Sequence, residues 1–220
     1  MDERTNIPVM LEVANQRCVV VGGGPVGARR AKALADAQAL VVVVAPDMEP
    51  TLIKLASEKP NIELIQRGFE FDDLKDAFLV VIASNSEQAN GEARRSAIHH
   101  NVLMDGAHAK RGSDLTFMAC DRQGPLTIAV HTDGASANAA KQIRASLVEH
   151  LDPAWPSILR LAAAAREPLY AIEDPGLRRK SMLQLVDPVA VEAYKAKGEA
   201  GLSSLYTQII DQAFKADQSS

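Results

Sequence analysis

The sequence predicts an α/β fold whose N-terminal half is built around a parallel, doubly wound sheet. Three observations carry this prediction. Short β-branched runs alternate with helical stretches between residues 17 and 104, a glycine-rich loop at 22–27 joins the first run to the first helical stretch, and the pattern changes after residue 112. We therefore expect a Rossmann-type parallel sheet, followed by a hairpin-plus-helix dimerisation region and a C-terminal helical domain.

Each element of the expected sheet has its own signal. The continuous apolar run at 40–44 is typical of a strand covered on both faces, and Pro25 suits a first helical turn, where its missing N–H costs nothing. By such criteria, strands are expected at 17–21, 40–44, 62–66, 77–83 and 102–104, with helices at 25–37, 48–58 and 87–100 and an acidic helical turn at 72–76. The short links between them favour right-handed crossovers between parallel strands.

The second half of the chain predicts other structures. Apolar runs at 115–121 and 126–132 flank the turn residues 122–125, which is typical of a hairpin. A helix is expected at 136–151, with Ala140, Ile143, Leu147 and Leu151 on one apolar stripe that suits a dimer interface. Helices broken at Pro168 and at 174–176 should follow. The expected domains are 1–112 for the sheet, 113–151 for the dimerisation region and 152–220 for the helical domain.

Composition narrows the class of protein. The chain is 47% hydrophobic and 24% charged, as in globular proteins, and its net charge of −4 offers no positive field for nucleic acid. No apolar stretch approaches the roughly 20 residues of a membrane span, and the N-terminus does not resemble a secretory signal. Cys18 and Cys120 lie in apolar, strand-like settings. We expect buried free thiols and a cytoplasmic protein that binds neither nucleic acid nor membranes.

The glycine loop Gly22-Gly23-Gly24-Pro25-Val26-Gly27 contains the G-x-G-x-x-G pattern between a strand and a helix. The first glycine permits a tight turn, the second lets the backbone approach a pyrophosphate, and the third lets helix and strand pack closely. The helix N-terminus then faces the phosphates. The alternative is a tight turn that binds nothing, but the strand-loop-helix context favours a dinucleotide site.

The second expected strand ends in Ala45, Pro46 and Asp47. An acid near this point would hold the ribose hydroxyls of NAD, and Asp47 is either this acid or the N-cap of the next helix. Because no arginine lies near this strand end to bind a 2′-phosphate, NAD is favoured over NADP as the cofactor.

These residues resemble the NAD-dependent precorrin-2 dehydrogenase family of sirohaem biosynthesis, some members of which are also sirohydrochlorin ferrochelatases. The resemblance covers roughly residues 7–151. It rests on a short N-terminal strand at 7–11, the segments 19–27 and 43–46, Ala83-Ser84-Asn85-Ser86 with Asn90, Asp105, the hairpin sequence 124–130, and the loop 134–136. Two positions depart from the family pattern: Gly106-Ala107 follows Asp105 without the usual proline, and Asp133 stands where a glycine is usual.

The resemblance implies a site as well as a fold. The implied cofactor-binding residues are Gly22, Gly23, Gly24, Pro25, Val26, Gly27, Ala45, Pro46, Asp47, Ala83, Ser84 and Asn85. Asp105, expected just after the fifth strand, aligns with the family's catalytic aspartate, and would act as a general base or accept pyrrole N–H bonds. Without the resemblance, Asp105 would be assigned to an Asx turn leading into Gly106.

The substrate would be a tetrapyrrole, precorrin-2 or its product sirohydrochlorin, and Fe²⁺ is a further substrate if the chelatase activity is present. The implied substrate-binding residues are His108, Lys110, Thr132 and Ser136. His108 and His131 are equally explained as surface histidines, Lys110 and Arg111 as solvated loop charges, and Ser136 as a helix N-cap. No Cys, His and Asp cluster has the spacing of a permanent metal site.

The sequence thus predicts an NAD-dependent dehydrogenase that acts as a homodimer. Two alternatives stay open: a tetrapyrrole metal chelatase with weak dehydrogenase activity, and an NAD-sensing regulatory module. The link through Ala45 and Pro46 disfavours the sensor, because such modules usually end the second strand directly in an acid.

Overall fold

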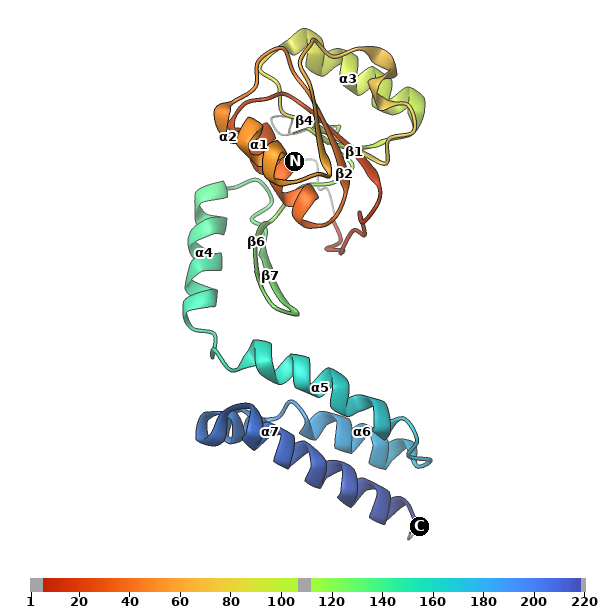
Figure 1. Cartoon of the computed structure of the whole chain (residues 1–220), viewed down its shortest axis with the longest axis vertical. Coiled ribbons are helices and arrows are strands. Elements are labelled where there is room, and N and C mark those ends of the chain that lie inside the picture. Colours follow the sequence, from red (N-terminus) through yellow and green to blue (C-terminus); the bar gives the residue numbers. More distant parts are fainter. Residues whose placement is uncertain (1–5, 107–111, 219–220) are drawn as a thin grey trace. The chain divides into compact units, whose positions relative to one another are not determined.

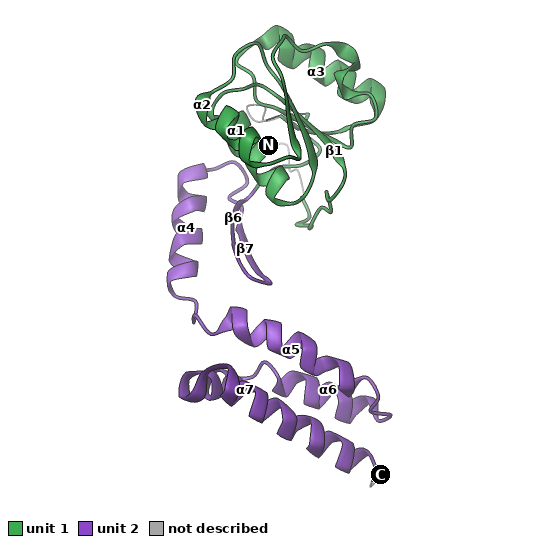
Figure 2. Ribbon diagram, viewed as in Figure 1, with its two compact units in different colours: residues 1–117 green, residues 118–220 purple. Residues whose placement is uncertain are grey.

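The structure is a computed structural model that describes residues 6–106 and 112–218. The chain divides into two compact units, residues 1–117 (unit 1) and residues 118–220 (unit 2), which Figure 2 colours separately. Each unit has its own hydrophobic core and is described by itself below.

Unit 1 is built around a five-stranded parallel sheet with strand order β3-β2-β1-β4-β5 (Figure 1). Its elements are β1 (Arg17–Val21), α1 (Pro25–Asp36), β2 (Leu40–Val44), α2 (Pro50–Glu58), β3 (Ile62–Ile65), the short 3₁₀ helix η1 (Phe71–Leu74), β4 (Leu79–Ile82), α3 (Glu87–His100) and β5 (Leu103–Gly106). The strand order reverses between β1 and β4, and ligands of open α/β sheets bind at such a point, outside the carboxyl ends of the strands. The predicted Rossmann-type parallel sheet is confirmed.

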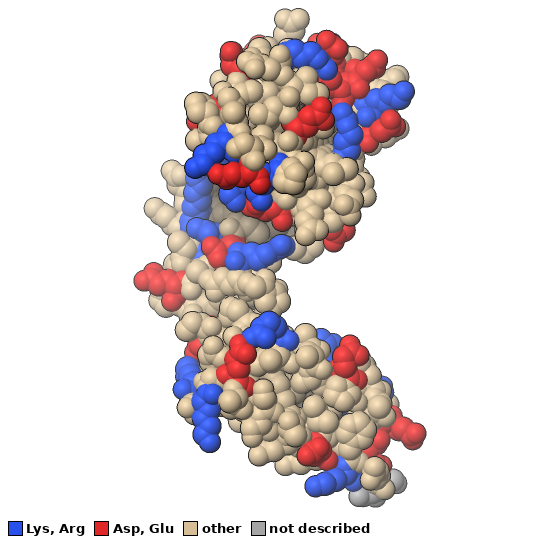
Figure 3. All heavy atoms as spheres, viewed as in Figure 1, with Lys and Arg blue, Asp and Glu red and all other residues tan. Residues whose placement is uncertain are grey.

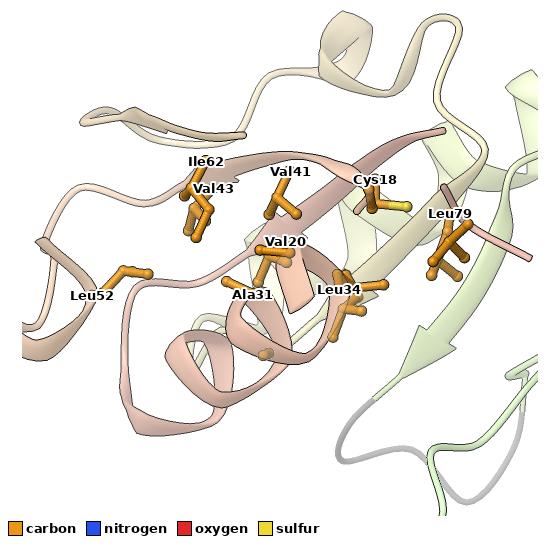
Figure 4. Packing of buried hydrophobic residues seen from close by; sticks show 14 residues of the cluster. Cys18, Val20, Ala31, Leu34, Val41, Val43, Leu52, Ile62 and Leu79 are labelled. Carbon is orange, nitrogen blue, oxygen red and sulfur yellow. The ribbon is translucent and has the colours of Figure 1, made fainter. Parts of the chain in front are cut away.

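Helices cover both faces of this sheet, and the alternation of strand side chains divides the core into two layers. On one face, Val20, Val41, Val43 and Leu79 pack with Ala31 and Leu34 of α1 and Leu52 of α2 (Figure 4). On the other face, Val19, Val42 and Val80 pack with Ala93 and Ala97 of α3. Burial of one Val or Leu side chain contributes about 1.5–3 kcal/mol, so a strand buried on both faces requires the continuous apolar runs that predicted it.

The strand β5 extends further than its sequence predicts, and this moves Asp105. The predicted strand ended at Met104, because aspartate and glycine are poor strand formers. In the structure, Asp105 pairs with Val81 and Gly106 with Ile82, so Asp105 lies inside β5 and not after it. The far edge of β5 is also held, since the Met104 N–H donates to Asp114 and the Gly106 N–H donates to Ser113 Oγ, both over 3.0 Å. Hydrogen bonds on both edges of β5 outweigh the weak strand propensity of Asp105 and Gly106.

Unit 2 begins with an antiparallel hairpin, β6 (Ala119–Gln123) and β7 (Leu126–Val130), followed by α4 (Ala137–Glu149). Three further helices, α5 (Trp155–Leu169), α6 (Pro175–Gln184) and α7 (Pro188–Asp217), enclose a separate core. Non-helical angles at Lys197 and Gly198 interrupt α7. The predicted hairpin, helix and helical C-terminal region are confirmed, but the first hairpin strand starts at Ala119 because Leu115 and Phe117 pack against the core of unit 1.

Three local predictions are wrong. Residues 7–11 form no strand, and among the described residues none pairs with them; Ile7 is 78% exposed. Cys120 is exposed, because alternate residues of the hairpin strand β6 face solvent, whereas Cys18 lies in the sheet core. Pro168 does not break a helix, because it lies in the last turn of α5. At this helix end the hydrogen bonds join residues three apart, as from the Tyr170 N–H to the Glu167 carbonyl.

Candidate functional site

The packing of unit 1 itself requires three of the four glycines in the loop between β1 and α1. Gly22 has φ of +123°, and a Cβ there would lie 2.6 Å from the Ala83 carbonyl oxygen. A Cβ on Gly27 would collide with the Gly22 carbonyl, and one on Gly23 would collide with the Asp47 carbonyl. The predicted roles of the first and third motif glycines, a tight turn and close helix–strand packing, therefore have a direct structural reason.

Gly24, the second glycine of the motif, is different. A Cβ at this position would meet no atom of the described residues within 4 Å, and its φ of −81° is open to any residue. Gly24 is also the N-cap of α1; in the part of the chain that the structure describes, no side chain caps this helix, and no acid lies in its first turn. Unpaired N–H groups and the positive end of the helix dipole suit an anion. The site therefore fits a dinucleotide pyrophosphate. The packing of unit 1 would accept a side chain at Gly24, but the glycine found there leaves the space open for close approach of the pyrophosphate.

The other two predicted cofactor segments flank this loop. The Asp47 carbonyl lies against Gly23 and the Ala83 carbonyl against Gly22, so the ends of β2 and β4 meet the glycine loop at one edge of the sheet. The N-cap of α2 is Glu49, so the alternative role of Asp47 as N-cap is wrong. Pro46 and the Asp47 side chain are exposed, which leaves the carboxylate free to contact a ribose.

The loop after β4 is ordered by its own polar groups. Ser84 Oγ accepts from the Ser86 N–H over 2.9 Å, and Asn90 Nδ2 donates to the Ser84 carbonyl over 2.9 Å. The remaining amide oxygen of Asn90 is buried without a hydrogen-bond partner among the described residues. Asn85 is exposed at the start of the loop.

Asp105 is a buried carboxylate on the face of the sheet that α1 covers. It is only 4% exposed, and its Oδ2 lies 3.8 Å from Nε of Arg30 on α1. The Arg30 guanidinium also lies 4.1 Å from the centre of the Phe117 ring, a cation–π contact. Burial raises the pKa of the Asp105 carboxyl above its ordinary value, and the Arg30 charge acts in the opposite direction. A carboxyl with a raised pKa takes up a proton more readily than an exposed one.

Neither Arg30 nor Phe117 is among the site residues predicted from the sequence. The signal was present in the spacing, because Arg30 follows Val26 by four residues and precedes Leu34 by four, and Val26 and Leu34 both pack on the core. A charged residue on the buried face of an amphipathic helix is expected to have a buried partner of opposite charge.

Two of the predicted substrate residues belong to the loop between β7 and α4 in unit 2. Ser136 caps α4, because its Oγ accepts from the Ala139 N–H over 3.1 Å. The Thr132 hydroxyl donates to the Ser136 carbonyl over 3.0 Å. Asp133 has φ of +49° and Gly134 φ of +75°, so a left-handed position that favours glycine carries aspartate here. The predicted residues His108 and Lys110, with Arg111, lie outside the described residues.

The structure thus joins the three cofactor segments and Asp105 on one sheet, whereas Thr132 and Ser136 belong to the other unit. Acidic and basic side chains are mixed over the visible face of each unit (Figure 3). Within residues 6–106 and 112–218, no three His, Cys, Asp or Glu side chains gather to hold a metal ion. In the same residues, no helix is both long and apolar enough to span a membrane.

Similarity to known proteins concerns this same region. Residues 9–119 match the family model described as putative NAD(P)-binding. The chain is 29% identical over 187 residues to the siroheme synthase of Methylococcus capsulatus, which covers 84% of this chain and 39% of that protein. It is 31% identical over 160 residues to the siroheme synthase of Nitrosococcus oceani, covering 73% and 34% respectively. The chain therefore spans less than half the length of these relatives.

A solved structure, named SirC, precorrin-2 dehydrogenase, has the same fold. It superposes with a TM-score of 0.74 at 22% sequence identity, over 93% of this chain and 98% of that one. The family match includes the glycine loop, both flanking strand ends and Asp105. The chain therefore belongs to the putative NAD(P)-binding family, which confirms the family resemblance predicted from its sequence and a nicotinamide dinucleotide as its cofactor.

Proposed function

We propose that this protein is an NAD-dependent precorrin-2 dehydrogenase that forms sirohydrochlorin in sirohaem biosynthesis. The observation that carries the proposal is the open approach at Gly24, at the N-terminus of α1, on the same sheet as the buried carboxylate of Asp105. The siroheme synthase relatives and the precorrin-2 dehydrogenase fold support the choice of substrate.

The residues of the chain divide the work of this reaction. NAD⁺, when bound, would supply the hydride acceptor for this oxidation. The N–H groups at the start of α1 would hold the pyrophosphate, and Asp47 would hold a ribose. Asp105 accepts the proton that precorrin-2 loses together with the hydride, so the products are sirohydrochlorin, NADH and a proton passed on to solvent. His108, Lys110, Thr132 and Ser136 bind substrate carboxylates, Ser136 with the N-terminus of α4.

Anaerobic incubation of the chain with precorrin-2 and NAD⁺ tests this function directly. Formation of NADH and of the sirohydrochlorin spectrum, in equal amounts, is the expected result. Absence of both products at enzyme concentrations that bind NAD would reject the dehydrogenase and favour the sensor. Added Fe²⁺ in the same assay shows whether the chain also makes sirohaem, the chelatase activity that the resemblance implies.

NAD is expected to bind more tightly than NADP. Asp47 and Glu49 are the ionisable residues that follow β2, and a carboxylate here repels a 2′-phosphate. We expect a difference of about tenfold or more in Kd, equivalent to about 1.4 kcal/mol, by calorimetry. Asp47→Asn should reduce the difference. Tighter binding of NADP to the unchanged chain would contradict the role given to Asp47.

A homodimer is expected, with residues 113–151 crossing between two copies and completing each other's sites. Ile143 and Leu147 on α4 are 47% and 50% exposed, an apolar stripe left open in the single chain. Light scattering should give twice the chain mass of 23.6 kDa. Leu147→Glu should dissociate the dimer, whereas Gln142→Glu adds the same charge to an exposed polar position and should not. A monomer at micromolar concentration would contradict this interface.

The division into a 1–112 cofactor domain, a 113–151 dimerisation region and a 152–220 helical domain is part of the same proposal. We also propose a cytoplasmic location, in line with two free cysteines, Cys18 and Cys120.

A further inference from the structure

We propose that Arg30 is a positioning residue for the reaction: its charge keeps the buried Asp105 carboxylate ionised, and therefore able to take up a proton. This inference rests on the proposed function, because it concerns the group that we assign as the base. Arg30 itself does not need to touch the substrate or the cofactor.

The helix α1 brings Arg30 to Asp105 as a consequence of the glycine loop. Gly27 allows α1 to pack closely on β1, and Arg30 lies one turn further along, with a side chain that is 22% exposed. The guanidinium carbon of Arg30 lies 4.1 Å from the centre of the Phe117 ring. Arg30 therefore links the element that binds the cofactor to the carboxylate on β5.

A second ion pair in unit 1 shows what a purely structural pair looks like in this fold. Arg67 binds Asp73 through two hydrogen bonds of 2.8 and 2.6 Å, and Asp73 also accepts from the Glu70 N–H. In contrast, Arg30 Nε and Asp105 Oδ2 are 3.8 Å apart, and neither atom has a hydrogen-bond partner among the described residues.

This difference matters because burying unsatisfied charged atoms is costly. An ion pair retained for stability should satisfy its donors and acceptors, as the pair Arg67–Asp73 does. The loose pair Arg30–Asp105 places a positive charge near the carboxylate without a hydrogen bond between Arg30 Nε and Asp105 Oδ2. Asp105 Oδ2 therefore keeps its capacity to accept a proton.

Within residues 6–106 and 112–218, Arg30 is also the dominant charge at Asp105. On α1, Arg29 is exposed and Lys32 is paired with Asp36 over 2.5 Å. The neighbouring strand β4 (Leu79–Ile82) is apolar, and on the other edge of β5 the Asp114 carboxylate accepts from the Met104 N–H. Among the described residues, Arg30 is the charge that lowers the pKa of Asp105.

The direction in which loss of Arg30 should shift the pKa of Asp105 follows from two opposing influences, burial and the Arg30 charge. Burial raises the pKa of Asp105, and Arg30 lowers it. Loss of the positive charge should raise the pKa of Asp105 further. Because a general base must be ionised, the acid limb of the kcat profile should move to higher pH, and the rate should recover at alkaline pH.

The experiment compares Arg30→Met and Arg30→Lys with the control Arg29→Met, which removes the same charge from the exposed side of α1. We expect R30M to lose about tenfold or more in kcat on the acid limb and to approach the unchanged chain at high pH. R30K should largely retain the parent profile, and R29M should match it. In parallel, carbon-13 NMR of labelled aspartate, assigned with Asp105→Asn, should show Asp105 titrating at higher pH in R30M.

Two results would overturn the inference: an equal loss of kcat at every pH, or an Asp105 titration that R30M leaves unmoved. Should R30M fail to fold, Arg30→Gln removes the charge while keeping a polar group, and the same readouts apply. The titration needs no substrate. A parent chain without turnover would therefore reject the proposed function alone, and the NMR shift would still decide whether Arg30 controls Asp105.

Discussion

Gly24→Asp is expected to abolish NAD binding while the protein stays folded. The new carboxylate would lie where the pyrophosphate approaches the N-terminus of α1. Repulsion between these like charges should reduce the binding free energy by several kcal/mol. This corresponds to a loss of about 100-fold or more in affinity. Because a Cβ at Gly24 would meet no described residue within 4 Å and φ is −81°, the melting temperature should change little. Calorimetry with NAD measures the loss.

Gly68→Asp is the matched control for this variant. Gly68 follows β3, is exposed, and likewise has open space where a Cβ would be. The same charge at this position should leave NAD binding unchanged. In contrast, Gly27→Asp should unfold the chain, because its Cβ collides with the Gly22 carbonyl. Affinity of Gly24→Asp within a few-fold of the parent would remove the cofactor site from this loop.

Asp105→Ala is expected to reduce dehydrogenase turnover by at least about 10²-fold, the lower range of general-base catalysis. Affinity for NAD should be retained, since Asp105 lies in β5 while the glycine loop follows β1. The measurement is kcat for NADH formation, together with calorimetry and thermal unfolding of the same sample. A loss of turnover with unchanged NAD binding would assign Asp105 to the chemical step.

Asp105→Asn separates two roles of this residue. The amide keeps the size of the side chain and one acceptor oxygen, but it cannot take up a proton at neutral pH. If Asn retains most of the activity, Asp105 orients the substrate and is not the base. If Ala also leaves turnover unchanged, the base must be sought elsewhere, at Asp133 or His131. Unfolding of both variants would mean that the buried pair with Arg30 serves stability alone.

The sequence alone determined the elements whose signal is local and repeated. Continuous apolar runs such as Leu40–Val44 can be satisfied only by a strand buried on both faces, and short links then favour parallel order. The glycine loop was equally readable, because the φ of +123° at Gly22 and the contact of Gly27 with the Gly22 carbonyl both arise within one strand-loop-helix unit. The hairpin turn and the Ser136 cap are also local, and both were predicted.

Tertiary structure decided the features that depend on residues far apart in the chain. Asp105 has the local chemistry of a turn, but hydrogen bonds from β4 and from residues 113–114 hold it inside β5. The exposure of Cys120 depends on which face of a two-stranded hairpin is covered, and a period of two in the sequence does not say which. Arg30 meets Asp105 and Phe117 only because α1 packs on the sheet, from where the Arg30 side chain reaches a carboxylate on β5 and a ring in the segment after it. The periodicity of a sequence determines which residues share a face of one helix or strand. Which faces then pack against one another is decided by tertiary structure, and the proposed base Asp105 lies where α1 and β5 meet through Arg30.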